Sequence, residues 1–94
     1  MRIIWLTKAR EDILIIDDFL SKDSVVVADM VVSKILIEVR VLLSSPGIGR
    51  PGRVKSTREL VLLDIPYIIA YRVKDSSIEI LRVLHQSRIW PASL

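Results

Sequence analysis

The clearest pattern in the chain runs from Arg50 to Pro91 and reads RPGRVKSTRELVLLDIPYIIAYRVKDSSIEILRVLHQSRIWP. It begins with a loop rich in Gly, Pro and basic residues, and continues through three apolar runs at about 58–63, 67–73 and 78–85. The polar breaks between these runs are short enough for hairpin connections. The pattern therefore predicts three consecutive antiparallel strands.

Two helical patterns precede this stretch. Apolar residues between positions 8 and 20 recur at spacings of three and four, and the same spacing runs from Val25 to Leu43. Thr7 and Ser24 stand where N-caps are needed, and residues 2–6 form an initial short strand. The order β-α-α-β-β-β predicts an α+β fold, in which a helical hairpin packs on one face of a small, mainly antiparallel sheet.

The second helical segment contains more apolar residues than one buried face needs. The additional residues are Val26, Val27, Met30, Ile37 and Val41. We expect them to widen the buried stripe of the helix. The alternative is an exposed patch that contacts another chain. The face of the sheet opposite the helices is expected to be open and to carry any functional site.

Composition limits the class of protein. Residues 1–94 are expected to form a single domain, with enough Val, Ile and Leu for a modest core. The chain has no Cys, which excludes disulfides, thiolate nucleophiles and Cys-based zinc sites; no metal or cofactor is expected. Charges interrupt the apolar segment 25–43, so it does not resemble a membrane span. With no recognisable signal peptide, we expect a cytoplasmic protein.

Positive charge is concentrated in the C-terminal part. Residues 50–91 contain eight bases and four acids, whereas residues 1–49 contain six bases and seven acids. A local positive field attracts an anionic partner even when the total charge is small. The candidate partner-binding residues are Arg50, Arg53, Lys55, Arg58, Arg72, Arg88 and Trp90. The charged residues can also be simple solvated charges, and Trp90 can also cap the core.

The order of elements and several segments resemble the ParE/RelE superfamily of bacterial type II toxins. The segments are IIWLTKAREDILIIDDFL (3–20), SPGIGRPGRVKSTREL (45–60), PYIIAYRV (66–73) and LRVLHQSRIWP (81–91). The resemblance implies a toxin that is held in check by a co-expressed antitoxin, with which it forms a hetero-oligomer. RelE-type members cleave mRNA on the ribosome, whereas ParE-type members inhibit DNA gyrase.

Ribonuclease chemistry would need a base, an acid and cations around the scissile phosphate. The candidates for such a set are Glu59, Arg82 and His85. Each also has a structural explanation. Glu59 can form a surface ion pair with Arg58, Arg82 can be buried and paired with an acid, and His85 can pack at the end of its strand. Strand alternation places Arg82 on the same face as Ile80.

Two positions favour one branch of the superfamily. The ribonuclease relatives usually carry a cation early in the third strand and a Tyr near the C-terminus, where this chain has Ile68 and Gln86. The resemblance therefore implies a ParE-like toxin that binds DNA gyrase and is not an enzyme. The alternative is a RelE-like, ribosome-dependent mRNA endoribonuclease. A third hypothesis is an inactive member that only assembles with its antitoxin.

Overall fold

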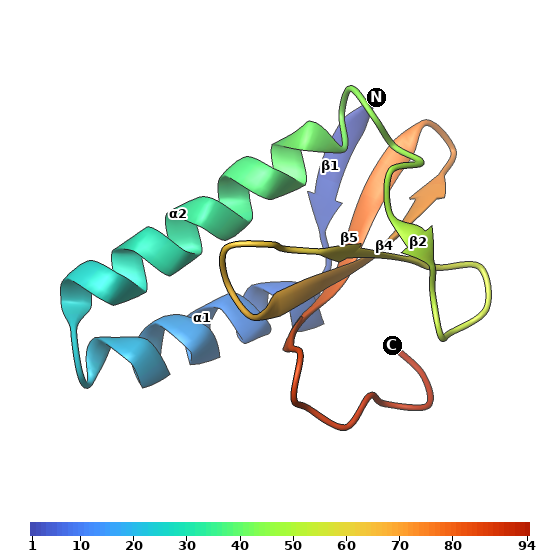
Figure 1. The fold of residues 1–94 in the computed structure, drawn as a ribbon. Helices are drawn as coiled ribbons and strands as arrows, with labels where there is room; N and C mark the ends of the chain where they lie inside the picture. The colour runs from blue at the N-terminus through green and yellow to red at the C-terminus, as the bar shows by residue number, and fades with distance from the viewer.

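A five-stranded sheet and a pair of helices make up the computed structural model, which describes residues 1–94 (Figure 1). The elements are β1 (Arg2–Trp5), α1 (Thr7–Ser21), α2 (Val25–Val41), β2 (Arg50–Pro51), β3 (Arg58–Val61), β4 (Tyr67–Lys74) and β5 (Ser77–His85). The strand order is β1-β5-β4-β3-β2, and only the β1–β5 pair is parallel. The predicted α+β fold is confirmed; the two-residue strand β2 was not expected.

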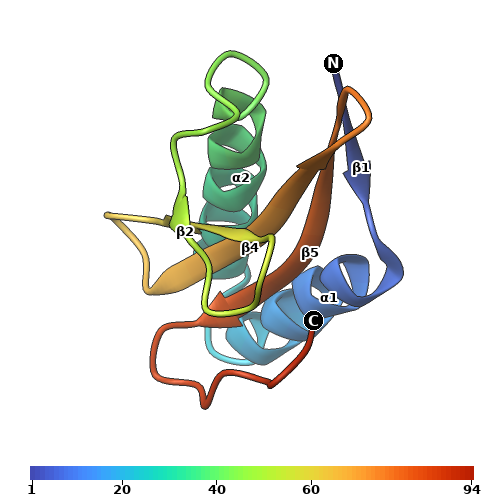
Figure 2. The same ribbon diagram turned by 90° about the vertical axis from the view of Figure 1, so that its right-hand side faces the viewer.

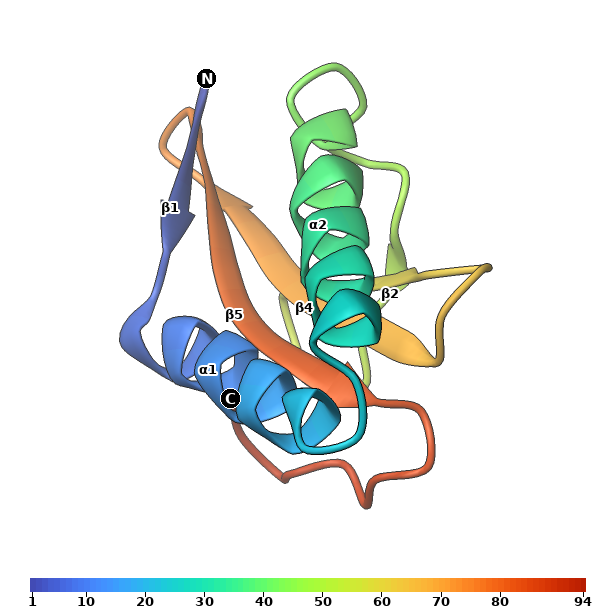
Figure 3. The same ribbon diagram turned by 90° about the vertical axis from the view of Figure 1, so that its left-hand side faces the viewer.

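The two helices form an antiparallel hairpin that packs on one face of the sheet (Figures 1 and 3). Ala9 and Ile16 of α1 share one core with Ile35 of α2 and with Tyr71 of the sheet. Apolar side chains at helical spacing therefore bury the hairpin against the strands, as predicted. Neither helix has the length and apolar composition that a membrane-spanning helix needs.

The two predicted helix caps have different outcomes. The Ser24 side chain accepts a hydrogen bond from the backbone N–H of Val27 at 3.2 Å and caps α2 as expected. Thr7, in contrast, is the first residue of α1, and the capping position belongs to Leu6, whose side chain makes no cap. The prediction that Thr7 caps α1 is wrong because the chain turns from β1 into the helix one residue earlier.

A β-bulge lies in β5. Tyr71 of β4 is opposite Ile80, but the preceding residue, Ala70, is opposite Arg82, so Leu81 is an additional residue in β5. Paired residues of antiparallel strands point to the same face. The bulge therefore puts Ile80 on the helix side, with Tyr71, and Arg82 on the opposite side, with Ala70. The prediction that Arg82 shares a face with Ile80 is wrong.

Arg82 pairs with Asp12 of α1, whose carboxylate lies at the edge of β5, beyond the last residue that pairs with β1. Its Nε donates to Asp12 Oδ2 at 2.8 Å and its Nη2 to Asp12 Oδ1 at 3.0 Å. The backbone N–H of Val83 also donates to Asp12 Oδ2, at 2.9 Å. The hydrogen bond to Asp12 raises the pKa of Arg82 above its usual value. The paired, structural explanation of Arg82 is the one that the structure supports.

The second face of the sheet is covered at its centre. Ile68, Ala70 and Leu84 are all buried, although their strand positions place them away from the helix side. Figures 1 and 2 show residues 52–57 and the segment after β5 on this side of the sheet. The expectation of an open second face is therefore wrong for its central part.

Removing one partner of the Asp12–Arg82 pair is expected to destabilise the fold strongly. Replacing Asp12 by Ala leaves a guanidinium that is only 12% exposed without its partner, and such losses typically cost about 3–5 kcal/mol. Asp18→Ala is the control, because Asp18 pairs with Lys22 at an exposed position and such pairs contribute less than about 1 kcal/mol. Urea unfolding measures both variants, and equal losses would contradict the assignment.

Candidate partner-binding surfaces

The basic loop is a tight turn between β2 and β3. Gly52 N–H donates to the carbonyl of Thr57 at 2.8 Å, and a Cβ on Gly52 would lie 2.1 Å from Thr57 Oγ1. Only glycine fits at this position without displacing the turn. Ser56 completes the turn with a φ of 67°, in the left-handed region. The turn places the side chain of Lys55 in solvent.

Glu59 is the anchor of this loop. Its carboxylate accepts from Arg50 Nη2 at 2.9 Å and from the backbone N–H of Arg53 at 2.8 Å, and Arg53 Nε lies 3.6 Å away. Glu59 is 2% exposed, so its charge is compensated inside the protein. The predicted surface ion pair with Arg58 is wrong, because β2 brings Arg50 directly opposite Glu59.

Arg58 and Tyr71 hold the chain that enters β2. Arg58 Nη1 donates to the carbonyl of Gly49 at 2.9 Å. The Tyr71 hydroxyl donates to the carbonyl of Pro46 at 2.7 Å and accepts from Gly49 N–H at 2.9 Å. Burial raises the pKa of Tyr71, an effect that the Gly49 hydrogen bond and nearby Arg58 partly oppose. Arg58, a candidate for partner binding, therefore has a structural role of its own.

His85 is exposed at the end of β5. Its Nδ1 accepts from the backbone N–H of Ser87 at 3.1 Å, and its ring meets Tyr67 edge-on at 5.3 Å. His85 is opposite Tyr67 on β4, whereas Glu59 is opposite Ala70. That offset of three residues corresponds to about 10 Å along the direction of the strands. The candidate set Glu59, Arg82 and His85 is therefore not gathered into one site.

The C-terminal segment contacts the basic loop through Arg53 and Trp90. The Arg53 guanidinium lies 4.3 Å from the centre of the Trp90 ring, a cation–π arrangement. Trp90 is half-buried, and its Nε1 is buried without a hydrogen-bond partner. The two candidates Arg53 and Trp90 are thus brought together, and Arg50 joins them through Glu59.

The remaining basic candidates differ in whether they are paired with an acid of the chain. Arg72 pairs with Glu79 and lines, with Arg58, a small polar pocket of about 290 Å³. Lys55 and Arg88 are exposed and make no ion pair. No cluster of three or more His, Cys, Asp or Glu side chains is gathered in a metal-binding arrangement. Lys55 and Arg88 are therefore the predicted residues most available to an anionic partner.

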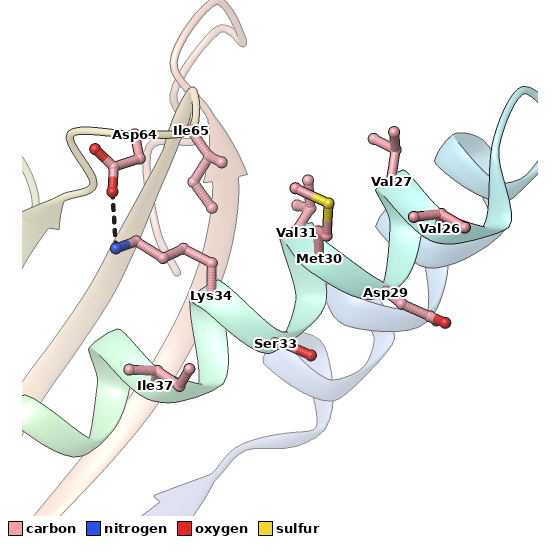
Figure 4. Close-up of a pocket in the computed structure, with 10 residues that line it drawn as sticks. All are labelled: Val26, Val27, Asp29, Met30, Val31, Ser33, Lys34, Ile37, Asp64 and Ile65. Carbon is pink, nitrogen blue, oxygen red and sulfur yellow. Dashed lines mark ion pairs between the residues drawn. The ribbon is translucent and has the colours of Figure 1, made fainter.

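A second exposed surface lies on α2, at residues that the sequence predicts to be in the core. Val26, Met30 and Ile37 of α2 are 69%, 65% and 61% exposed, and Val27 and Val41 are also exposed. The interpretation that these residues widen the buried stripe is wrong. Most of them line a groove of about 670 Å³ between α2 and Ile65, next to the β3–β4 connection (Figure 4).

The groove on α2 has a charged rim. Lys34 Nζ lies 2.8 Å from Asp64 and 3.2 Å from Glu38, and the first of these ion pairs is drawn in Figure 4. The hydrogen bond to Asp64, followed by that to Glu38, raises the pKa of Lys34. An apolar floor with ionic groups at its edge is typical of protein–protein contact sites.

These features define a small toxin of the RelE/ParE type: a helical hairpin on a mainly antiparallel sheet, with a basic loop and a short basic C-terminal segment. The solved structure "Chromosomal ParDE TA system from P. aeruginosa" matches with a TM-score of 0.81 and 32% identity, over 90% of this chain and 95% of that chain. Residues 3–90 match the family described as "ParE toxin of type II toxin-antitoxin system, parDE". The chain belongs to this ParE toxin family.

Two further proteins are similar over nearly their whole length. "Putative toxin Y4kP" of Sinorhizobium fredii is 46% identical over 93 residues, which are 99% of this chain and 96% of that protein. "Toxin RelE2" of Caulobacter vibrioides is 28% identical over 88 residues, or 94% of this chain and 98% of that protein. The recognition of the ParE/RelE superfamily from the sequence is confirmed, and the chain is a type II toxin of a ParDE-like system.

The basic loop allows a direct test of which charges are structural. Arg50→Ala removes a partner of the buried Glu59 carboxylate, and we expect it to lower the free energy of unfolding by about 1–3 kcal/mol. Lys55→Ala removes one positive charge from the loop that follows β2 but breaks no contact with an acid, so its effect should stay within about 0.5 kcal/mol. Thermal and urea unfolding measure both. Equal stabilities of the two variants would contradict the role given to Glu59.

Proposed function

We propose that this toxin inhibits bacterial growth by binding DNA gyrase, and that a cognate antitoxin neutralises it. The observation that supports inhibition by binding is that the Glu59 carboxylate is already occupied within the protein. A general base must reach the proton that it abstracts with a free lone pair, but the Glu59 carboxylate is buried and occupied by Arg50 and Arg53. This favours a toxin that acts by binding.

The remaining members of the ribonuclease set support the same proposal. Arg82 donates two hydrogen bonds to the Asp12 carboxylate, so its guanidinium is not directed at an external phosphate. His85 is exposed at a strand end, about 10 Å along the sheet from Glu59. Cations that stabilise a transition state have to be preorganised around one reacting group, and these side chains face different partners.

The surface proposed to meet gyrase, or the gyrase–DNA complex, comprises the basic loop and the C-terminal segment. Lys55 and Arg88 are exposed and make no ion pair, and Arg53 with Trp90 forms a cation–π pair. Exposed charges at the rim of an interface act mainly on the rate of encounter. Arg50 and Arg72 are less available, because each is bound to an acid of the chain.

The groove on α2 is proposed as an antitoxin site. Its exposed Val, Met and Ile side chains leave a large apolar surface in water, and contiguous patches of this kind usually mark protein contacts. A short, partly disordered antitoxin segment is suited to wrap such a surface, because it orders only on binding. The match to a solved ParDE system supports an antitoxin as the occupant.

A second candidate function is ribosome-dependent mRNA cleavage. Two observations favour it: the similarity to a protein named "Toxin RelE2", and the exposure of His85 close to Arg88, whose N–H donates to the His85 carbonyl at 3.0 Å. Histidine is the side chain that most often serves as a general acid or base. If the toxin cleaves mRNA in this way, His85 is essential for the inhibition of growth.

The two functions differ in what His85→Ala does to growth inhibition. If the toxin acts by binding, the variant should inhibit growth in an inducible strain nearly as strongly as the parent. A ribonuclease that loses its general acid or base would slow by about 10²–10⁴-fold. Circular dichroism confirms folding of the variant. Loss of inhibition on that scale in a folded protein would favour the ribonuclease.

Charge placed in the groove on α2 should separate neutralisation from toxicity. Met30→Lys is expected to weaken antitoxin binding by tenfold or more, since about 1.4 kcal/mol corresponds to a factor of ten, while growth inhibition by the toxin alone stays unchanged. Ile48→Lys is the matched control, because Ile48 is exposed on a loop outside the groove. Calorimetric titration with the antitoxin measures both. Equal affinities for the two variants would exclude this groove.

A further inference from the structure

Helix α2 has an exposed stripe that runs along nearly its whole length. Successive residues of the stripe are separated by four, three, four and four positions: Val26, Met30, Ser33, Ile37 and Val41. All five are exposed, and the first four also line the groove on α2 (Figure 4). Such spacings place side chains on one side of a helix. We call this surface the outer stripe of α2, and its pattern is typical of a helix that packs against a second helix.

The outer stripe is complementary to itself when two copies of α2 run antiparallel. If the partner's Ile37 lies opposite Met30, then the partner's Val41 lies opposite Val26, and Ser33 lies beside the two-fold axis. Each large side chain of the stripe then meets an apolar side chain of the partner. The small side chain of Ser33 lets the two helices approach closely where they cross, since the distance between packed helices depends on the side chains at the contact.

The charges beside the stripe fit the same antiparallel arrangement. Eleven residues separate Asp29 from Arg40, which is about three helical turns, so both lie along the same side of the stripe. Both are exposed, and neither takes part in an ion pair. Antiparallel pairing brings Asp29 and the partner's Arg40 to nearly the same level, and the two-fold axis repeats this contact. Parallel pairing would instead place Asp29 opposite the partner's Asp29.

On the other side of the stripe, positive charge is already compensated within the chain. Lys34 is paired with Asp64 and Glu38, so the two Lys34 side chains near the two-fold axis do not meet as bare charges. The Lys34–Asp64 pair also holds the β3–β4 connection beside α2 (Figure 4). In this connection Leu63 is 95% exposed, so apolar surface continues from α2 onto its neighbour.

We propose that the free toxin forms a two-fold symmetric homodimer through the outer stripes of two antiparallel α2 helices. A second copy fits this surface because the apolar residues and the charges beside them match in a single arrangement. The contact uses one helix of each chain, so the interface is small and the dimer weak. If the groove on α2 is also the antitoxin site, a condition that rests on the proposed function, the dimer and the antitoxin complex exclude each other.

The test is the oligomeric state of the purified toxin alone, measured by sedimentation equilibrium from micromolar to millimolar concentrations. The parent protein should change from monomer to dimer as its concentration rises. Ile37→Ala removes apolar surface that the dimer contains twice, and should weaken the dimer by about tenfold or more. Ile48→Ala is the matched control, because Ile48 is exposed on a loop outside the stripe, and it should dimerise as the parent does.

An exchange of charges tests the antiparallel pairing. Asp29→Arg turns two attractions into two repulsions and should weaken the dimer by about fivefold or more. When Arg40→Asp is added, both contacts return with their signs exchanged, so the double variant should dimerise within about twofold of the parent. Asp18→Arg makes the first charge change at an exposed position of α1 and should leave the dimer unchanged. Circular dichroism confirms that each variant is folded.

A toxin that stays monomeric at millimolar concentration would overturn the proposal and leave the outer stripe to another chain. A dimer that is as strong in Ile37→Ala as in the parent would also overturn it, as would a double charge variant that dimerises no better than Asp29→Arg. The experiment contains neither antitoxin nor gyrase. Failure of the homodimer is therefore distinguishable from failure of the proposed function.

Discussion

One carboxylate, that of Asp12, connects the helical hairpin to the sheet. β1 pairs with β5 only as far as Ile80, and the chain then turns into α1. The N–H of Val83, farther along β5, is satisfied by Asp12, which also holds Arg82 in a two-pronged ion pair. A buried guanidinium and a buried N–H are both costly without partners. The position of α1 and the course of β5 therefore depend on this contact, and so do the surfaces built on them.

The same logic divides the basic residues into two groups. Buried carboxylates at Asp12 and Glu59 hold Arg82, Arg50 and Arg53, so much of the positive charge of the C-terminal part is used within the protein. Lys55 and Arg88 remain free for a partner. Net charge describes how a chain attracts partners from a distance, but only the unpaired charges are available at contact. This division explains why a strongly basic segment need not be a phosphate-binding site.

The order of elements could be predicted from the sequence because apolar spacing is a local property. Leu81 could not be recognised as a bulge, since one additional residue in an apolar run leaves the composition of the run unchanged, yet it reverses the face of Arg82. The Glu59 pairing depends on β2, a strand of two residues that carries no pattern. Met30 and Ile37 were assigned to the core because helical spacing does not reveal how much of a helix the sheet can cover.

We propose that this ParE-family toxin acts by binding gyrase and not by cutting RNA. The most direct measurement adds the purified toxin, over the same concentration range, to a gyrase supercoiling reaction and to a cell-free translation reaction with reporter mRNA. If the toxin binds gyrase, supercoiling is inhibited while the mRNA stays intact and translation continues. Cleaved mRNA and arrested translation, with supercoiling unaffected, would contradict it.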